Sequence, residues 1–114
     1  MNIRDYLDST YLKTNSQAGL SESENEAVVQ SFIQEAIVEK FKLIMIRPDR
    51  VALAKKIIVD ANSKVLIGTV IDFPEGTSPV PDKLDEALVC IQNGADELDF
   101  VCNYEAFKSG EVEL

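Results

Sequence analysis

The strongest constraint on the fold is the alternation of strand-like and helix-like stretches along the chain. Short stretches rich in β-forming or apolar residues predict strands at 5–11, 42–47, 64–72 and 97–103, with helical periodicity between them. The third stretch is apolar almost throughout, which predicts a strand buried on both faces. Such alternation indicates an α/β fold with a parallel sheet and right-handed crossovers. Two architectures satisfy it: an open, doubly wound sheet, or half of an eight-stranded (β/α) barrel.

The expected helices have recognisable end signals. Overlapping capping-box patterns begin at Ser21 and Ser23, within a polar stretch at 15–23 that is expected to be a connection. Pro48 is expected in the first turn of the second helix, where its missing N–H does no harm. The third helix is expected to end at Gly94, because glycine readily adopts the backbone conformation that follows a helix.

Composition narrows the classes of protein to which the chain can belong. Its 114 residues suit one domain, and 46 % hydrophobic with 27 % charged residues is typical of a globular chain. A net charge of −9 without a basic patch argues against nucleic acid or an anionic membrane as a partner. The chain has no apolar run of the roughly 18 residues that a membrane span needs. It also shows no signal peptide, so a cytoplasmic location is expected.

The residue inventory removes several kinds of catalysis. The chain has no histidine, which excludes histidine-based triads and histidine-ligated zinc. Its two cysteines, Cys90 and Cys102, are not spaced as a redox pair and are expected as reduced thiols. The five glycines form neither a dinucleotide-binding motif nor a phosphate loop. Any catalysis must therefore rest on Asp, Glu, Lys, Tyr, Ser or Thr.

Three of the predicted strands carry an aspartate, and active sites of parallel α/β folds lie at the carboxyl ends of strands. Asp99 lies inside the fourth strand, where burial would remove its hydration unless it is paired, hydrogen-bonded or protonated. Two interpretations remain open: a group that transfers protons, or a structural acid bonded to a neighbour. Asp8 shares a strand face with Thr10. Asp72 is better interpreted as a turn that ends the third strand.

Asp8, Asp72 and Asp99 also suggest a divalent-metal cluster. Against this, metal sites of the phosphate-accepting receiver type place adjacent acids after the first strand, whereas Asp8 is followed by Ser9 and Thr10.

The eight lysines are all expected to be solvated surface residues. A lysine that forms a Schiff base must be desolvated inside a pocket. None of these lysines is flanked by strand residues on both sides. Only Lys13 lies at the carboxyl end of a predicted strand, and solvation in a loop would make it a poor nucleophile.

Four motifs together resemble one family. They are YLDSTYLK, LIMIRP, IGTVIDFPEG and NGADELDFV, in this order along the chain. The pattern of an Asp–x–Thr–x–Leu strand, then V-x-x-F-P-x-G, then G-A-D-E-hydrophobic-D is similar to the N-terminal half of deoxyribose-phosphate aldolase. The resemblance covers nearly the whole sequence. It implies a TIM-barrel fold, with residues 1–114 as a single domain that forms about four βα units of a (β/α)8 barrel.

The resemblance also implies an activity. The family's reaction is a class I aldol cleavage of 2-deoxy-D-ribose 5-phosphate, a step of nucleoside catabolism, which gives D-glyceraldehyde 3-phosphate and acetaldehyde through a lysine Schiff base. It implies a lyase with a small sugar phosphate or aldehyde as substrate, and with neither cofactor nor metal. By the same resemblance Asp99 is the catalytic aspartate and Asp8 the first-strand acid of the proton relay. The implied pocket positions are Thr10, Leu12, Met45, Val70 and Phe73.

The family's Schiff-base lysine, its activating lysine and its phosphate site are expected beyond Leu114. The chain alone is therefore expected to be an inactive fragment that lacks the Schiff-base lysine. Its first and fourth strands would be exposed edges, so self-association through these edges is expected. Two alternatives stay open: a non-catalytic, self-associating half-barrel module, or a small metal-dependent domain that uses Asp8, Asp72 and Asp99.

Overall fold

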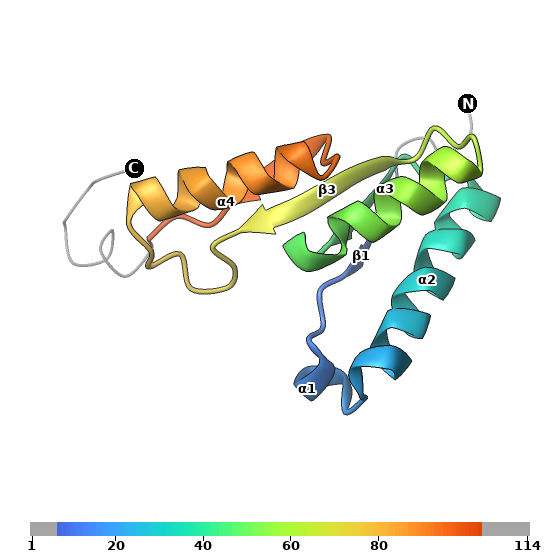
Figure 1. Ribbon diagram of the computed structural model, residues 1–114, viewed down its shortest axis with the longest axis horizontal. Coiled ribbons are helices and arrows are strands. Elements are labelled where there is room, and N and C mark those ends of the chain that lie inside the picture. Colours follow the sequence, from blue (N-terminus) through green and yellow to red (C-terminus); the bar gives the residue numbers. More distant parts are fainter. Residues whose placement is uncertain (1–6, 104–114) are drawn as a thin grey trace.

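The computed structural model describes residues 7–103, which form a four-stranded parallel sheet flanked by helices (Figure 1). The strands lie in the order β1-β2-β3-β4, so each pairs with its neighbour in the sequence. The elements are β1 (Asp8–Tyr11), α1 (Asn15–Ala18), α2 (Glu22–Glu39), β2 (Leu43–Ile46), the 3-10 turn η2 (Pro48–Arg50), α3 (Val51–Asp60), β3 (Leu66–Ile71), α4 (Val80–Gln92) and β4 (Glu97–Phe100). The predicted α/β fold with parallel strands is confirmed.

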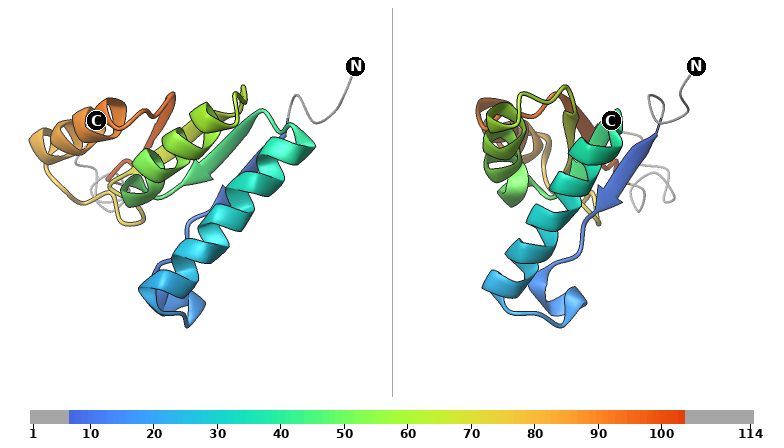
Figure 2. Two further views of the ribbon diagram at one scale, coloured as in Figure 1. Left: turned by 45° about the vertical axis from the view of Figure 1, so that its right-hand side comes forward. Right: turned by 90° about the vertical axis from the view of Figure 1, so that its right-hand side faces the viewer.

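The two faces of the sheet have different surroundings. Alternate strand residues such as Ile44, Ile46 and Ile67 pack with α2 and α3 in the main core, where each is at most 1 % exposed. Ile71 packs with residues of α4 in a second cluster on the same face. Figure 2 shows the helices side by side along this face. Helices on one face only are typical of a (β/α) barrel, whereas a doubly wound sheet is covered on both faces.

The helix signals acted largely as predicted. The first of the two overlapping capping boxes is the one used, because Ser21 accepts a hydrogen bond from the backbone of Glu24 and the Glu24 side chain bonds back. Pro48 opens a 3-10 turn that leads into α3. Gly94 follows the end of α4 with a positive φ of 111°. No helix within residues 7–103 is both long and apolar enough to cross a membrane.

Two sequence expectations about secondary structure were wrong. The stretch 15–23 contains the short helix α1, which a second capping box from Thr14 to Gln17 begins. The strands are also shorter than predicted: β3 begins at Leu66 and β4 ends at Phe100. The strands are short because the hydrogen-bonded ladder extends only over the residues that neighbouring strands pair in register. Of the first predicted strand, positions 5 and 6 lie outside the described residues.

Candidate functional site

The sheet face that the helices leave open carries a small apolar cluster. Leu43, Met45 and Val70 are buried there, and the partly buried Leu12 packs against them. A side chain on Gly68 would come within 2.8 Å of the Met45 methyl group, so the absence of a side chain at Gly68 leaves room for Met45. Leu12, Met45 and Val70, three of the apolar positions expected from the sequence, therefore lie together.

Polar residues surround this cluster in register with it. Thr10 pairs with Met45, and Asp99 pairs with Val70, so both neighbour the apolar cluster on the open face. Asp8 lies on the same strand face, one alternate position before Thr10, and pairs with Leu43. The faces predicted for the first and fourth strands are therefore those observed.

The expectation that Asp99 loses its hydration was wrong. Asp99 is exposed, as are Asp8 and Thr10. The expectation assumed that the fourth strand is buried on both sides. In residues 7–103, β4 is an edge strand and no second layer covers this face, so water reaches the carboxylate.

The structure does not bring the three aspartates together. Asp8 and Asp99 lie on opposite edge strands, separated by three strand spacings, which is roughly 14 Å across a sheet. Asp72 follows β3 and takes part in a different set of contacts. Within residues 7–103, no three His, Cys, Asp or Glu side chains converge on a point that could hold a metal ion. The metal-cluster hypothesis is therefore wrong for these residues.

Asp72 acts as a structural turn residue, the interpretation that the sequence favoured. It adopts a left-handed backbone with φ of 59°, which aspartate tolerates better than most residues. One of its carboxylate oxygens accepts a hydrogen bond from the Ser78 backbone and the other from the Ser78 hydroxyl, both at 2.8 Å. Its own backbone N–H donates to Glu86 of α4 at 2.9 Å. These bonds attach the loop after β3 to the start of α4.

The prediction that every lysine is a solvated surface residue was wrong for Lys83. Its side chain is only 13 % exposed and forms an ion pair with Asp72 at 3.7 Å. It also donates to two backbone carbonyl oxygens, those of Gly76 and Val101. The other six described lysines lie outside the four strands, as expected; Lys108 lies outside the described residues.

Arg47, which the sequence analysis did not single out, reaches the same site from the end of β2. Its guanidinium donates to the Leu12 carbonyl oxygen at 2.8 Å and lies 5.6 Å from the centre of the Phe73 ring. It thereby connects two predicted pocket residues from different loops. A signal was present in the sequence, because Arg47 is a charged residue at the carboxyl end of an apolar strand.

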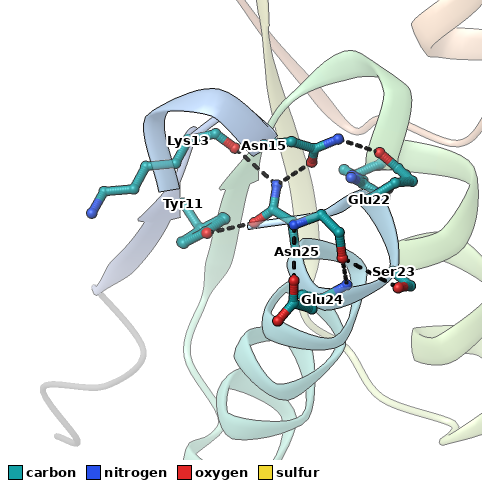
Figure 3. A network of polar contacts seen from close by, with 9 residues as sticks. Tyr11, Lys13, Asn15, Glu22, Ser23, Glu24 and Asn25 are labelled. Atoms are coloured by element: carbon teal, nitrogen blue, oxygen red, sulfur yellow. Dashed lines mark hydrogen bonds and ion pairs between the residues drawn. The ribbon is translucent and has the colours of Figure 1, made fainter. Parts of the chain in front are cut away.

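A polar network fixes the exit of β1 (Figure 3). Asn25 is 1 % exposed; its carbonyl oxygen accepts a 2.6 Å bond from the Tyr11 hydroxyl, and its amide donates to Asn15 and to the Lys13 backbone. Asn15 in turn donates to Glu22 at 2.6 Å. This bond, together with the charge of a nearby arginine, lowers the pKa of Glu22 below its usual value. The loop that follows Leu12 is therefore held firmly against α2.

Comparison with known proteins places the fold in context. No family model matches the sequence. Curated relatives include deoxyribose-phosphate aldolase from Metamycoplasma hominis, which is 37 % identical over 97 % of this chain and 46 % of its own length. Another is deoxyribose-phosphate aldolase 1 from Staphylococcus aureus (strain MRSA252), 36 % identical over 99 % of this chain and 47 % of its own. The chain therefore spans about half the length of the curated relatives it matches.

Solved structures agree with this comparison. A putative deoxyribose-phosphate aldolase from Coccidioides immitis superposes with a TM-score of 0.79 and 31 % identity, over 94 % of this chain and 38 % of that one. A protein described as QR15, an aldolase, superposes with a TM-score of 0.80 and 32 % identity, over 97 % of this chain and 45 % of its own. The resemblance to deoxyribose-phosphate aldolases is thus confirmed in sequence and in structure, and the fold is a partial (β/α) barrel of their type.

Proposed function

We propose that this chain forms one side of the active site of a deoxyribose-phosphate aldolase, a lyase that cleaves 2-deoxy-D-ribose 5-phosphate to D-glyceraldehyde 3-phosphate and acetaldehyde. The observation that carries the proposal is the open sheet face, where Asp99 and Thr10 adjoin the cluster of Leu12, Met45 and Val70. The similarity to aldolases extends over nearly the whole chain, so it includes all of these positions.

In this proposal Asp99 transfers protons during formation and breakdown of the Schiff base. The relatives are about twice as long as this chain, and their remaining part would complete the barrel over the open face. Completion would enclose Asp99 in the interior of the barrel, where a positioned carboxylate can accept and return protons. Asp8 and Thr10 lie on the same face three strands away on β1, so they would take part in the relay only through the substrate or water between the two strands.

The apolar cluster would receive the two-carbon end of the substrate. Acetaldehyde has one methyl group and one carbonyl, so a small apolar pocket beside a carboxylate suits it. Leu12, Met45 and Val70 supply the wall. Arg47, which bonds to the Leu12 carbonyl oxygen, also lies over the Phe73 ring. No cofactor enters this reaction, because the lysine amine itself activates the aldehyde carbonyl.

The Schiff-base lysine would come from the part of the relatives that this chain does not match. None of the strands β1 to β4 carries a lysine. Lys83, whose side chain is only 13 % exposed, already donates hydrogen bonds to two backbone oxygens and forms an ion pair with Asp72. Its amine is therefore already engaged in contacts within this chain.

Borohydride trapping tests this assignment. The folded chain is incubated with acetaldehyde and reduced, and the products are read by intact mass and peptide mapping. We expect no saturable adduct on a single lysine, and only slow, scattered modification of the surface lysines. A single saturable adduct on one lysine would show that the nucleophile lies within this chain and would contradict the assignment.

The strand edges support a second proposal, that the chain associates with further copies. In the described sheet, the outer edges of β1 and β4 have no partner strand, and such edges readily pair with other strands. Val80, Leu84, Leu88 and Ile91 add an exposed apolar stripe along α4, each more than half exposed.

Sedimentation velocity across a dilution series tests this association. We expect a dimer or larger species that dissociates on dilution, and weaker association for Leu88→Glu. The control Val38→Glu changes a valine of α2 that is 72 % exposed and lies away from that stripe, and it should leave association unchanged. A monomer at every concentration would contradict the proposal.

A further inference from the structure

Lys83 bonds to two segments of the candidate site and so connects them. The Lys83 ammonium group donates hydrogen bonds to two carbonyl oxygens, those of Gly76 at 3.0 Å and of Val101 at 2.9 Å, and forms an ion pair with the Asp72 carboxylate at 3.7 Å. Its side chain is 13 % exposed and that of Asp72 is 15 % exposed. Charged bonds with so little solvent around them are stronger than the same bonds on an open surface.

The two carbonyl oxygens belong to segments that carry predicted site residues. Gly76 lies in the loop after β3, three positions after Phe73. Val101 lies directly after β4, two positions after Asp99. Lys83 itself extends from α4, which packs against β3. One side chain therefore connects the loop that carries the pocket aromatic to the strand that carries the carboxylate.

Close packing at Gly76 makes this connection tight. Gly76 has a left-handed backbone with φ of 73°, and a side chain there would come within 2.2 Å of the Cys102 carbonyl oxygen. The loop therefore rests directly on the backbone that leaves β4. The two backbones pack without a side chain between them, so a displacement of one segment would displace the other.

We propose that Lys83 is a positioning residue of the aldolase site, which sets the location of Asp99 relative to Phe73 by joining the loop after β3 to the exit of β4. The assignment of these two residues to the site rests on the proposed function, whereas the mechanical link does not depend on it. Within residues 7–103, β4 is an edge strand with a ladder on one side only, so the bond from Lys83 to Val101 is a principal restraint on its carboxyl end.

Nuclear magnetic resonance of the full chain tests the link. In Lys83→Met, which keeps the length of the side chain and removes its donors, we expect the Asp99 carboxyl and Phe73 ring resonances to shift. We also expect the Val101 amide, which bonds to Ile71 at 3.0 Å, to exchange with solvent at least about tenfold faster. The Leu66 amide, bonded at 2.9 Å at the other end of the sheet, should keep its exchange rate.

The control is Lys56→Met, which removes an exposed lysine from α3 and should move none of these signals. If Lys83→Met does not fold, Lys83→Arg, which keeps the charge but moves the donors, should show smaller shifts confined to the same residues. The proposal is overturned if a folded Lys83 variant leaves the Asp99 and Phe73 resonances unchanged, as the control does. It is also overturned if the variant shifts the resonances of the whole sheet uniformly. Failure of the proposed aldolase function would appear in an activity measurement. It would not alter the resonance changes expected in the Lys83 variants.

Discussion

Replacing Gly76 by alanine should weaken the chain far more than the same change at Gly19. Both glycines have a left-handed backbone, with φ of 73° and 68°, so alanine pays a conformational cost of about 1–2 kcal/mol at either position. Among the described residues, none lies within 4 Å of a side chain added at Gly19, whereas a side chain added at Gly76 comes within 2.2 Å of the Cys102 carbonyl oxygen. Relieving such a clash in a packed region costs about a further 2 kcal/mol.

Urea unfolding followed by circular dichroism measures both variants. We expect Gly19→Ala to lower the free energy of unfolding by about 1 kcal/mol. Gly76→Ala should lower it by about 3 kcal/mol, with a slope against urea that is unchanged. Equal losses in the two variants would refute the reasoning, because they would show that the loop after β3 does not rest on the exit of β4.

Two further predictions concern titrating groups. Burial raises the pKa of Cys90, so a thiol reagent at neutral pH should modify only the exposed Cys102 until urea unfolds the chain; rapid modification of two thiols in the folded chain would contradict this. Hydrogen bonds at the start of α2 lower the pKa of Glu22 and Glu24 below the usual 4.5. Their contribution to stability is therefore present above that value and is lost as the pH falls through the lowered pKa. Stability should fall less steeply below about pH 4.5 in Glu22→Gln/Glu24→Gln than in the original chain, and parallel curves would refute this.

The order and type of the major elements followed from local chemistry that the sequence displays. The Ser21 capping box, Pro48 and Gly94 act on their own neighbours, so their effects do not depend on distant packing. The faces of β1 and β4 followed from the two-residue period alone, which placed Asp8 with Thr10 and Asp99 away from Leu98.

The predictions that were wrong, and the site residues that were missed, concern contacts between distant parts of the chain. The exposure of Asp99 depends on what covers the sheet, and no local pattern in β4 contains that information. Lys83 reaches Val101, 18 positions away, and Arg47 reaches Leu12, 35 positions away. Spacing rules for helices and strands do not encode such bonds, so both residues were missed as parts of the site.

The most direct test of the central claim is the activity of a chimera. This chain replaces the 113 matching residues of the Staphylococcus aureus (strain MRSA252) relative, and cleavage of 2-deoxy-D-ribose 5-phosphate is measured with and without Asp99→Asn. We expect the chimera to cleave the substrate and Asp99→Asn to lower kcat/KM by at least about 100-fold, the usual contribution of a proton-transferring group. A folded chimera without activity, or one whose activity survives Asp99→Asn, would contradict the claim that this chain supplies the acid side of an aldolase site.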